Sequence, residues 1–176
     1  MEHSMRTMNF AAVLAGAWLA ASSVQAATFT EEQKLELVAA HNKYRAAVDE
    51  PGLVWSDSLA DRAHIWAEHL ANEVHALEHS HVPGFGENLA MWTARRSSLT
   101  QLVDLWGDER QYFVDAVFPD VSTTGDWEAV GHYTQMIWRD TTEVGCGLST
   151  GGGYDYLVCE YAPQGNFMGR MVLSSR

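Results

Sequence analysis

Two alternating apolar runs near the C-terminus, separated by three consecutive glycines, constrain the fold of this chain most. Val144, Cys146 and Leu148 alternate with Glu143, Gly145 and Gly147 in the first run, and Leu157, Cys159 and Tyr161 alternate with Tyr156, Val158 and Glu160 in the second. Such alternation is typical of strands, and the glycines at 151–153 indicate a hairpin loop. When Cys146 is placed opposite Cys159, every pair on that face is apolar, with Leu148 facing Leu157 and Val144 facing Tyr161. The sequence therefore predicts an antiparallel hairpin in that register.

The first 26 residues have the features of a secretory signal peptide. Arg6 precedes an apolar run from Phe10 to Val24, and the small-residue pattern Val24-Gln25-Ala26 is typical of a cleavage site. A membrane anchor is the alternative, but the run has about 15 residues and a membrane-spanning helix needs roughly 20. No later segment is apolar enough to cross a bilayer. We therefore expect cleavage after Ala26, a domain over residues 27–176, and a secreted, extracellular or periplasmic protein.

The middle of the chain has the periodicity of helices. Thr30 and Gln33 form a capping box, which predicts a helix over about 30–48. A second helix is expected from Ser56 or Ser58, with the apolar positions Leu59, Ala63, Trp66 and Leu70. A third is expected from Ser97 or Ser98, with the apolar stripe Leu102, Trp106 and Phe113. A short fourth helix is expected over His132–Trp138. A third strand is expected at Met168–Leu173. Helices followed by strands indicate one α+β domain with an antiparallel sheet covered by helices.

Charge and cysteine content exclude several classes of function. The 176-residue chain has a formal net charge of −12, and because an acidic chain repels phosphate backbones we expect no nucleic acid partner. Two cysteines are too few for a disulfide-rich scaffold or a four-cysteine zinc site.

The same two cysteines are expected to form a disulfide bond. Directly opposed residues of an antiparallel pair are close enough for the bond, and an exported protein meets an oxidising compartment. The pair Cys146–Cys159 would close a loop of about 14 residues and contribute about 3 kcal/mol. Two small buried thiols are the alternative.

Glu109 and His132 are candidate functional residues because of where they lie in the pattern. Glu109 falls on the apolar stripe of the third expected helix, where burying an acid is costly unless it is paired. His132 begins an apolar and aromatic helix. A histidine beside a carboxylate in a partly buried cleft is a plausible metal or acid–base site, although a structural hydrogen-bonded pair remains open. The segment from His75 to His79 matches the H-x-x-E-H pattern of zinc proteases, but its position at the end of a helix argues against that interpretation.

Several segments together resemble the CAP superfamily of cysteine-rich secretory proteins, antigen 5 and plant pathogenesis-related 1 proteins. They are His41-Asn42-Lys43-Tyr44-Arg45, His79-Ser80, Gly86-Glu87-Asn88-Leu89-Ala90, Trp106-Gly107-Asp108-Glu109, Gly131-His132-Tyr133-Thr134-Gln135-Met136-Ile137-Trp138, Val144-Gly145-Cys146-Gly147 and the run from Tyr156 to Asn166. They occur in family order and span nearly all of residues 27–176. The resemblance implies a three-layer α-β-α sandwich with a central antiparallel sheet, and it implies that the cysteine pair is a family disulfide.

The resemblance also implies a cleft that contains two histidines and two acids. Carried over by motif, these are His79, Glu87, Glu109 and His132. In family members this cleft can bind a divalent ion, often zinc, and here we expect zinc to be possible but not required for the fold. Imidazoles can ligate zinc, while the carboxylates either complete the coordination or orient the rings.

Three functions remain open at this level. The first is a non-enzymatic binder of a sterol-like or other apolar ligand, as the resemblance implies; candidate groove residues are Phe85, Met91, Trp92, Trp106, Trp127 and Trp138, for most of which core packing is the simpler role. The second is recognition of a protein partner at a surface. The third is a hydrolase in which His132 acts as base, Glu109 orients it and Ser80 is the nucleophile, or in which a metal-bound water attacks. The segment 41–45 is interpreted as structural.

Overall fold

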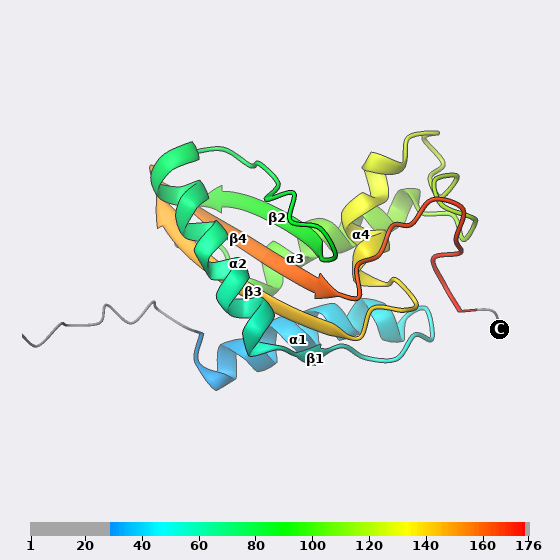
Figure 1. Ribbon diagram of the computed structural model, residues 1–176, viewed down its shortest axis with the longest axis horizontal. Helices are drawn as coiled ribbons and strands as arrows, with labels where there is room; N and C mark the ends of the chain where they lie inside the picture. Colours follow the sequence, from blue (N-terminus) through cyan, green and yellow to red (C-terminus); the bar gives the residue numbers. More distant parts are fainter. Residues whose placement is uncertain (1–28, 175–176) are drawn as a thin grey trace, which may run out of the picture.

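The structure, a computed structural model, describes residues 29–174 (Figure 1). Its elements in chain order are α1 (Glu31–Ala46), β1 (Val54–Trp55), α2 (Asp57–His69), a π-helical turn η1 (Leu70–Val74), β2 (Gly86–Thr93), α3 (Leu99–Gly107), the 3₁₀ turns η2 (Asp108–Tyr112) and η3 (Trp127–Val130), α4 (Gly131–Met136), β3 (Glu143–Gly151) and β4 (Tyr154–Ala162). The predicted signal peptide, 1–26, lies outside the described residues. Within 29–174, no helix has the length and apolar character needed to cross a bilayer.

The predicted hairpin is confirmed in its register. Strands β3 and β4 are antiparallel, and Cys146 is the partner of Cys159. Strand β2 pairs antiparallel with β4 on its other side, and the short β1 pairs in parallel with β3, which gives the order β1-β3-β4-β2. The centre of the sheet is therefore antiparallel as expected, and its one parallel pair is confined to two residues of β1.

The third strand is β2, and the expected strand at Met168–Leu173 is wrong. That segment runs through turns and makes a single bridge, between Met171 and Val117. Strand β2 has no alternating pattern because it is covered on both faces: Leu89 packs in the cluster beneath α2, and Ala90 packs in the cluster on the opposite side. Strands buried on both faces lose the alternation of apolar and polar residues that identifies strands in a sequence.

Helices cover both faces of the sheet, which confirms the three-layer sandwich (Figure 1). On one face α2 packs over β3 and β4 around Ala63, Ala67 and Leu70. The larger core, on the other face, joins α1, α3 and α4 to the side of the hairpin that bears the disulfide. The functional residues discussed below lie at one end of this second layer.

Helix α2 lies unusually close to the sheet because β3 has glycines beneath it. A Cβ atom at Gly145 would clash with the backbone of Ala60, and one at Gly147 would clash with the backbone of His64. The glycines that alternate with Val144 and Cys146 in the sequence therefore face α2, and their lack of a side chain sets the distance between helix and sheet.

The helix starts were predicted well, and one helix end was not. Thr30 and Ser98 both form capping boxes, with Gln33 and Gln101 respectively. Helix α3 ends at Gly107, earlier than the apolar stripe predicted, so Glu109 lies in the 3₁₀ turn η2 that follows it. The change from α to 3₁₀ geometry turns the Glu109 carboxylate toward the start of α4, where it finds a partner.

Arg45 confirms the structural interpretation of segment 41–45. Its side chain is buried and donates hydrogen bonds to the backbone carbonyls of Pro51, Met136, Trp138 and Thr141. The carbonyls of Met136 and Trp138 lie at and just after the C-terminal end of α4, and those of Pro51 and Thr141 lie in neighbouring loops. Arg45 thus fixes α4, and with it His132, against α1.

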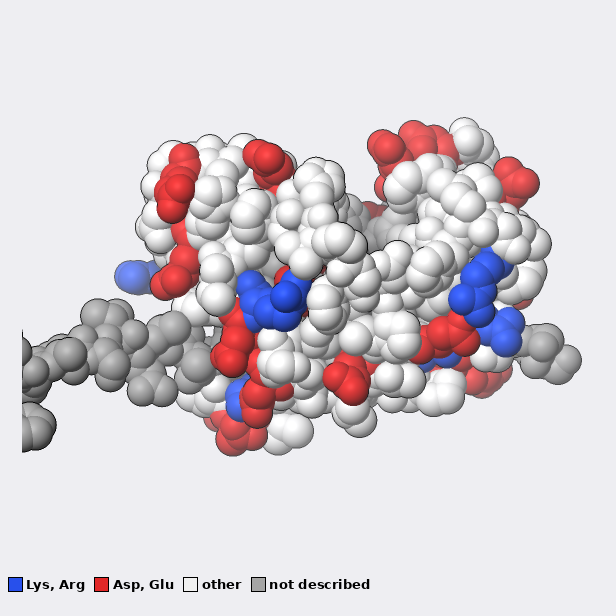
Figure 2. Space-filling model, in the orientation of Figure 1, with Lys and Arg blue, Asp and Glu red and all other residues white. Residues whose placement is uncertain are grey.

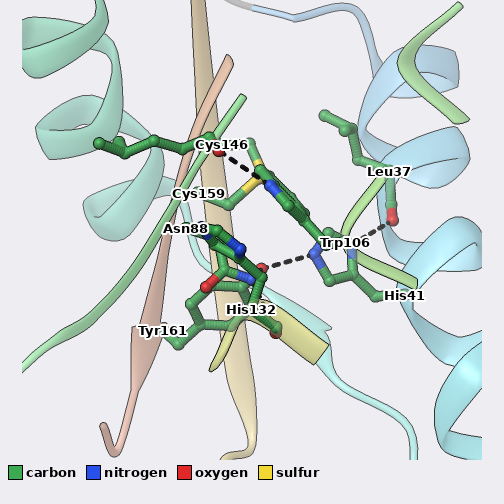
Figure 3. Close-up of a disulfide and its surroundings, with 9 residues drawn as sticks. Leu37, His41, Asn88, Trp106, His132, Cys146, Cys159 and Tyr161 are labelled. Atoms are coloured by element: carbon green, nitrogen blue, oxygen red, sulfur yellow. Dashed lines mark hydrogen bonds between the residues drawn. A yellow bond between two sulfur atoms is a disulfide. The ribbon is translucent and has the colours of Figure 1, made fainter. Parts of the chain in front are cut away.

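The predicted disulfide is present. Cys146 and Cys159 are joined, buried, and have Cα atoms 4.1 Å apart. The bond lies in the larger core, between the two central strands (Figure 3).

Candidate functional site

A cleft of about 550 Å³ lies between the start of β2, the N-terminal turn of α4 and the segment after β4. Figure 2 shows the outline of the molecule notched between the part that carries α2 and the part that carries α4. The residues that line the cleft are His79, Phe85, Gly86, Glu87, Asn88, Trp127, Glu128, Gly131, His132, Gln135, Gln164, Gly165 and Asn166. Most are polar, and the two aromatic rings come from different segments of the chain.

His132, in the first turn of α4, is held by the carboxylate of Glu109. Its Nδ1 lies 2.6 Å from Oε1 of Glu109, and the second oxygen of that carboxylate accepts the backbone N–H of Tyr133 at 2.9 Å. The Trp106 ring stacks on the imidazole at 6.2 Å between centroids. Since Nδ1 donates to the carboxylate, Nε2 is the nitrogen left for a ligand.

His79 is held in the same way by Glu87 at the start of β2. Its Nδ1 lies 2.6 Å from Oε1 of Glu87, and the same oxygen accepts the backbone N–H of Ser80 at 2.9 Å. Burial of Glu87 opposes its ionisation, but these hydrogen bonds outweigh burial and hold its pKa below the ordinary value. Glu87 therefore stays ionised, and it leaves Nε2 of His79 as the available nitrogen.

A buried chain of hydrogen bonds supports His132 from behind (Figure 3). Nδ1 of His41 donates to the Leu37 carbonyl at 2.7 Å, and its Nε2 accepts from the Tyr161 hydroxyl at 2.8 Å. The Asn88 amide donates to the Tyr161 oxygen at 3.1 Å and to the His132 carbonyl at 3.0 Å. Burial lowers the pKa of His41 to about 4, so this ring is neutral at pH 7 and its Nε2 can accept a hydrogen bond from the Tyr161 hydroxyl.

This chain of hydrogen bonds is the part of the site that sequence reasoning missed. His41, Asn88 and Tyr161 all lie in segments that carry the family resemblance, and that was the only available signal. Their connection depends on the packing of α1, β2 and β4 against α4, which no local pattern encodes.

The four residues carried over by motif do meet at one place. His79, Glu87 and His132 line the cleft, and Glu109 is bonded to the far side of the His132 ring. However, no group of three or more His, Cys, Asp or Glu side chains within 29–174 has the arrangement of a metal site. Each carboxylate is already hydrogen-bonded to a ring nitrogen, so it fits the role of orienting its histidine better than that of a ligand.

The hydroxyl of Ser80, the candidate nucleophile, interacts with the Glu87 carboxylate. The same hydroxyl accepts a long bond, 3.5 Å, from the backbone N–H of Val82, and the residue lines a smaller pocket of about 190 Å³ beside the cleft. Among the described residues, no hydrogen bond links this hydroxyl to His79 or His132. A serine mechanism needs such a contact with its base.

The candidate groove residues fall into two groups, those that line the cleft and those that do not. Phe85 and Trp127 line the cleft, whereas Trp106 and Trp138 are buried in the core and Met91 and Trp92 lie outside the cleft lining. His75 follows η1 with a left-handed backbone, φ 57°. His75 and His79 therefore do not share a helix, which agrees with the interpretation that the H-x-x-E-H pattern is accidental.

Comparison with known proteins finds relatives of this chain over most of its length. The model of the cysteine-rich secretory protein (CAP) family matches residues 38–161. Venom allergen 5 2 of Polybia paulista is 33% identical over 88% of this chain and 85% of its own length. Pathogenesis-related protein 1A of Nicotiana tabacum is 38% identical over 74% of each chain.

Solved structures show the same fold. The crystal structure of NaASP2 with Zn²⁺ superimposes with a TM-score of 0.72 at 22% identity, covering 86% of this chain and 90% of that one. BmVAL-1 superimposes with a TM-score of 0.69 at 24% identity, covering 84% of each chain. Family model, relatives and architecture agree, and this chain belongs to the CAP family of cysteine-rich secretory proteins.

Proposed function

We propose that this chain is an exported, non-enzymatic binding protein whose cleft holds a divalent cation, zinc first of all, through Nε2 of His79 and Nε2 of His132. The observation that carries the proposal is that the two rings are hydrogen-bonded in the same way. Both line one cleft, and each has its Nδ1 2.6 Å from a carboxylate oxygen. A carboxylate behind an imidazole fixes the tautomer and raises the basicity of the other nitrogen, as in many zinc sites. The solved NaASP2, of the same fold, contains Zn²⁺, which supports the choice of metal.

The cation would serve as a charged anchor for a ligand. Two imidazoles leave coordination positions for water or for a donor group of a bound molecule. The lining combines amide and carboxylate side chains with the rings of Phe85 and Trp127, and more of its surface is apolar than polar. Such a lining suits a ligand that has one donor group for the cation and an apolar part that lies against the two rings.

Export is part of the same proposal. A signal peptide over residues 1–26 would deliver the protein to an oxidising compartment, and the buried disulfide fits that environment. Mass spectrometry of protein recovered from outside the cytosol should find a chain that begins at Ala27. A full-length chain retained in the cytosol would contradict this assignment.

Calorimetric titration with zinc tests the binding function. Wild type should bind one equivalent, and His132→Ala should lose most of that affinity. His75→Ala is the matched control, because His75 is an exposed histidine outside the cleft lining and should leave the affinity unchanged. The proposal is wrong if wild type takes up no zinc, or if the control loses as much affinity as His132→Ala.

A peptide library tests the hydrolase alternative. Zinc-loaded wild type and His132→Ala should give the same background of cleaved peptides if the protein only binds. Cleavage by wild type that disappears in His132→Ala would establish an enzyme and overturn the non-enzymatic assignment.

A further inference from the structure

Most of the outer edge of β3 lacks a neighbouring strand. Strand β1 pairs only with Glu143 and Val144, and β3 continues to Gly151. Across residues 29–174, no backbone hydrogen bond reaches Leu148 or Thr150 from the side opposite β4, and both are accessible, whereas Cys146 is 2% exposed. Unpaired strand edges of this kind are templates for the addition of another strand.

The geometry of the disulfide shows which backbone groups face this edge. In an antiparallel pair, residues whose Cα atoms lie near 4.5 Å form the pairs that are not hydrogen-bonded to each other. Cys146 and Cys159 have Cα atoms 4.1 Å apart, so the N–H and C=O of Cys146 point away from β4. The alternation places those of Leu148 and Thr150 in the same direction. Two residues before Cys146, the Val144 carbonyl also points away from β4, and it accepts a hydrogen bond from the Ser56 N–H at 2.9 Å.

The free edge lies in a groove. One pocket of about 510 Å³ includes Cys146 and Gly147, and a second of about 370 Å³ includes Leu148, Ser149 and Thr150. The two pockets share Phe29, His64 and Glu68, so they are continuous along β3, with α2 on one side and the segment that begins α1 on the other. We call this the β3 groove; it shares no lining residue with the cleft of His79 and His132.

The rim of the β3 groove is acidic. Asp57, Asp61 and Glu68 line it, and the one lysine there, Lys34, is already bonded to Asp57 and Glu31. Ile65, which is 67% exposed, adds an apolar surface on the same side. A segment with basic side chains and a few apolar ones would complement this rim.

We propose that the β3 groove binds an extended segment of a partner protein with alternating basic and apolar residues, which adds to the sheet beside β3 in line with β1. Backbone groups of the segment pair with Leu148 and Thr150, where β3 is accessible, and its basic side chains contact Asp61 and Glu68. Main-chain pairing supplies affinity and the rim supplies selectivity, as in other cases of strand addition. This interaction is independent of the function proposed for the cleft.

Fluorescence anisotropy with a labelled peptide of alternating valine and lysine tests the proposal on the exported protein. Saturable binding is expected. The same peptide, N-methylated on every second residue so that the amides facing β3 carry no hydrogen, should not bind, because it cannot donate hydrogen bonds to the carbonyl groups of the strand edge. A valine–glutamate peptide should also fail. Equal binding of the methylated and unmethylated peptides would overturn the proposal, and so would absence of saturable binding.

Charge-reversal variants distinguish binding of the peptide at the β3 groove from a general attraction of a basic peptide to an acidic protein. Asp61→Lys/Glu68→Lys should weaken binding by at least about tenfold. Asp115→Lys/Asp120→Lys changes the net charge equally at exposed positions outside the groove and should not weaken it by as much. An equal loss in both double variants would contradict a site at the groove.

Amide hydrogen exchange places the peptide at the edge. In the free protein, the amides of Leu148 and Thr150 should exchange faster than that of Ser149, which faces β4, and the peptide should slow them selectively. If these amides are already as protected as that of Ser149 in the free protein, the edge is occupied by the chain's own N-terminal residues or by a second copy, and the proposal fails.

Discussion

Nδ1 of His132 and Oε1 of Glu109 lie 2.6 Å apart, although 23 positions of chain separate the two residues. The contact exists because α3 ends at Gly107 and the chain tightens into the 3₁₀ turn η2, which carries Glu109 to the N-terminal turn of α4. The second carboxylate oxygen accepts the Tyr133 N–H. One acid thus satisfies a free backbone donor of a helix start and also sets which nitrogen of His132 faces the cleft.

Replacement of Glu109 should weaken zinc binding without unfolding the protein. Glu109→Gln keeps the shape of the side chain but removes the charge that makes the far nitrogen of His132 basic, so zinc affinity should fall by about 10- to 100-fold. Calorimetric titration measures the change. Glu128→Gln is the matched control, because Glu128 lines the cleft and, among the described residues, has no hydrogen bond or ion pair with either histidine ring. Equal affinities in the two variants would show that Glu109 does not act through His132.

The sequence predicted the hairpin because two independent signals agreed there. The alternation around Cys146 and Cys159 and the glycine loop between the strands specify the same register. Strand β2 could not be recognised, since Leu89 and Ala90 are both buried on opposite faces of the sheet. Strand β1, with two residues, is too short to produce any pattern.

The site could be predicted only in part. Glu109 and His132 stand out because an acid and a histidine interrupt apolar helical patterns. His79 and Glu87 have no such local signal, and they were identified through the family resemblance. Asn88 and Tyr161 act through hydrogen bonds between elements far apart in the chain, so their role depends on tertiary packing.

Acid should destabilise the protein through His41. Burial lowers the pKa of His41 from 6.5 to about 4, so the unfolded chain binds a proton at a higher pH than the folded one does. The free energy of unfolding should therefore fall as the pH drops from about 6.5 to about 4, by up to about 3 kcal/mol from this residue, with no further loss from it at lower pH.

Urea unfolding at pH 7.5 and pH 4.5 measures this loss. His41→Gln removes the titrating ring, so its stability should depend much less on pH over that interval than the stability of wild type. If the variant loses as much stability as wild type between the two pH values, another group causes the acid sensitivity.

Removal of the disulfide should cost stability but leave the fold in place. Cys146 and Cys159 are 13 positions apart, and closing a loop of this length contributes about 3 kcal/mol. Urea unfolding of Cys146→Ala/Cys159→Ala, compared with oxidised wild type, measures the difference. An unchanged midpoint would show that the crosslink does not stabilise the native state.

A methyl group on the α2 side of β3 should disrupt the packing of helix on sheet. In Gly147→Ala the new Cβ would clash with the backbone of His64. Because the backbone cannot move aside cheaply, we expect the free energy of unfolding to fall by about 3 kcal/mol. Ser149→Ala is the control two residues along the same face of the strand, and it should change stability by much less. Thermal unfolding that shifts equally in both variants would argue against close packing at Gly147.

The central claim is that His79 and His132 bind the same cation. X-ray absorption at the zinc edge of the one-to-one complex tests it directly, because it counts the imidazole rings on the metal. Two imidazoles are expected in wild type, with Zn–N distances of about 2.0–2.1 Å, and one in His132→Ala. A single imidazole in wild type, or two that persist in His132→Ala, would contradict the claim.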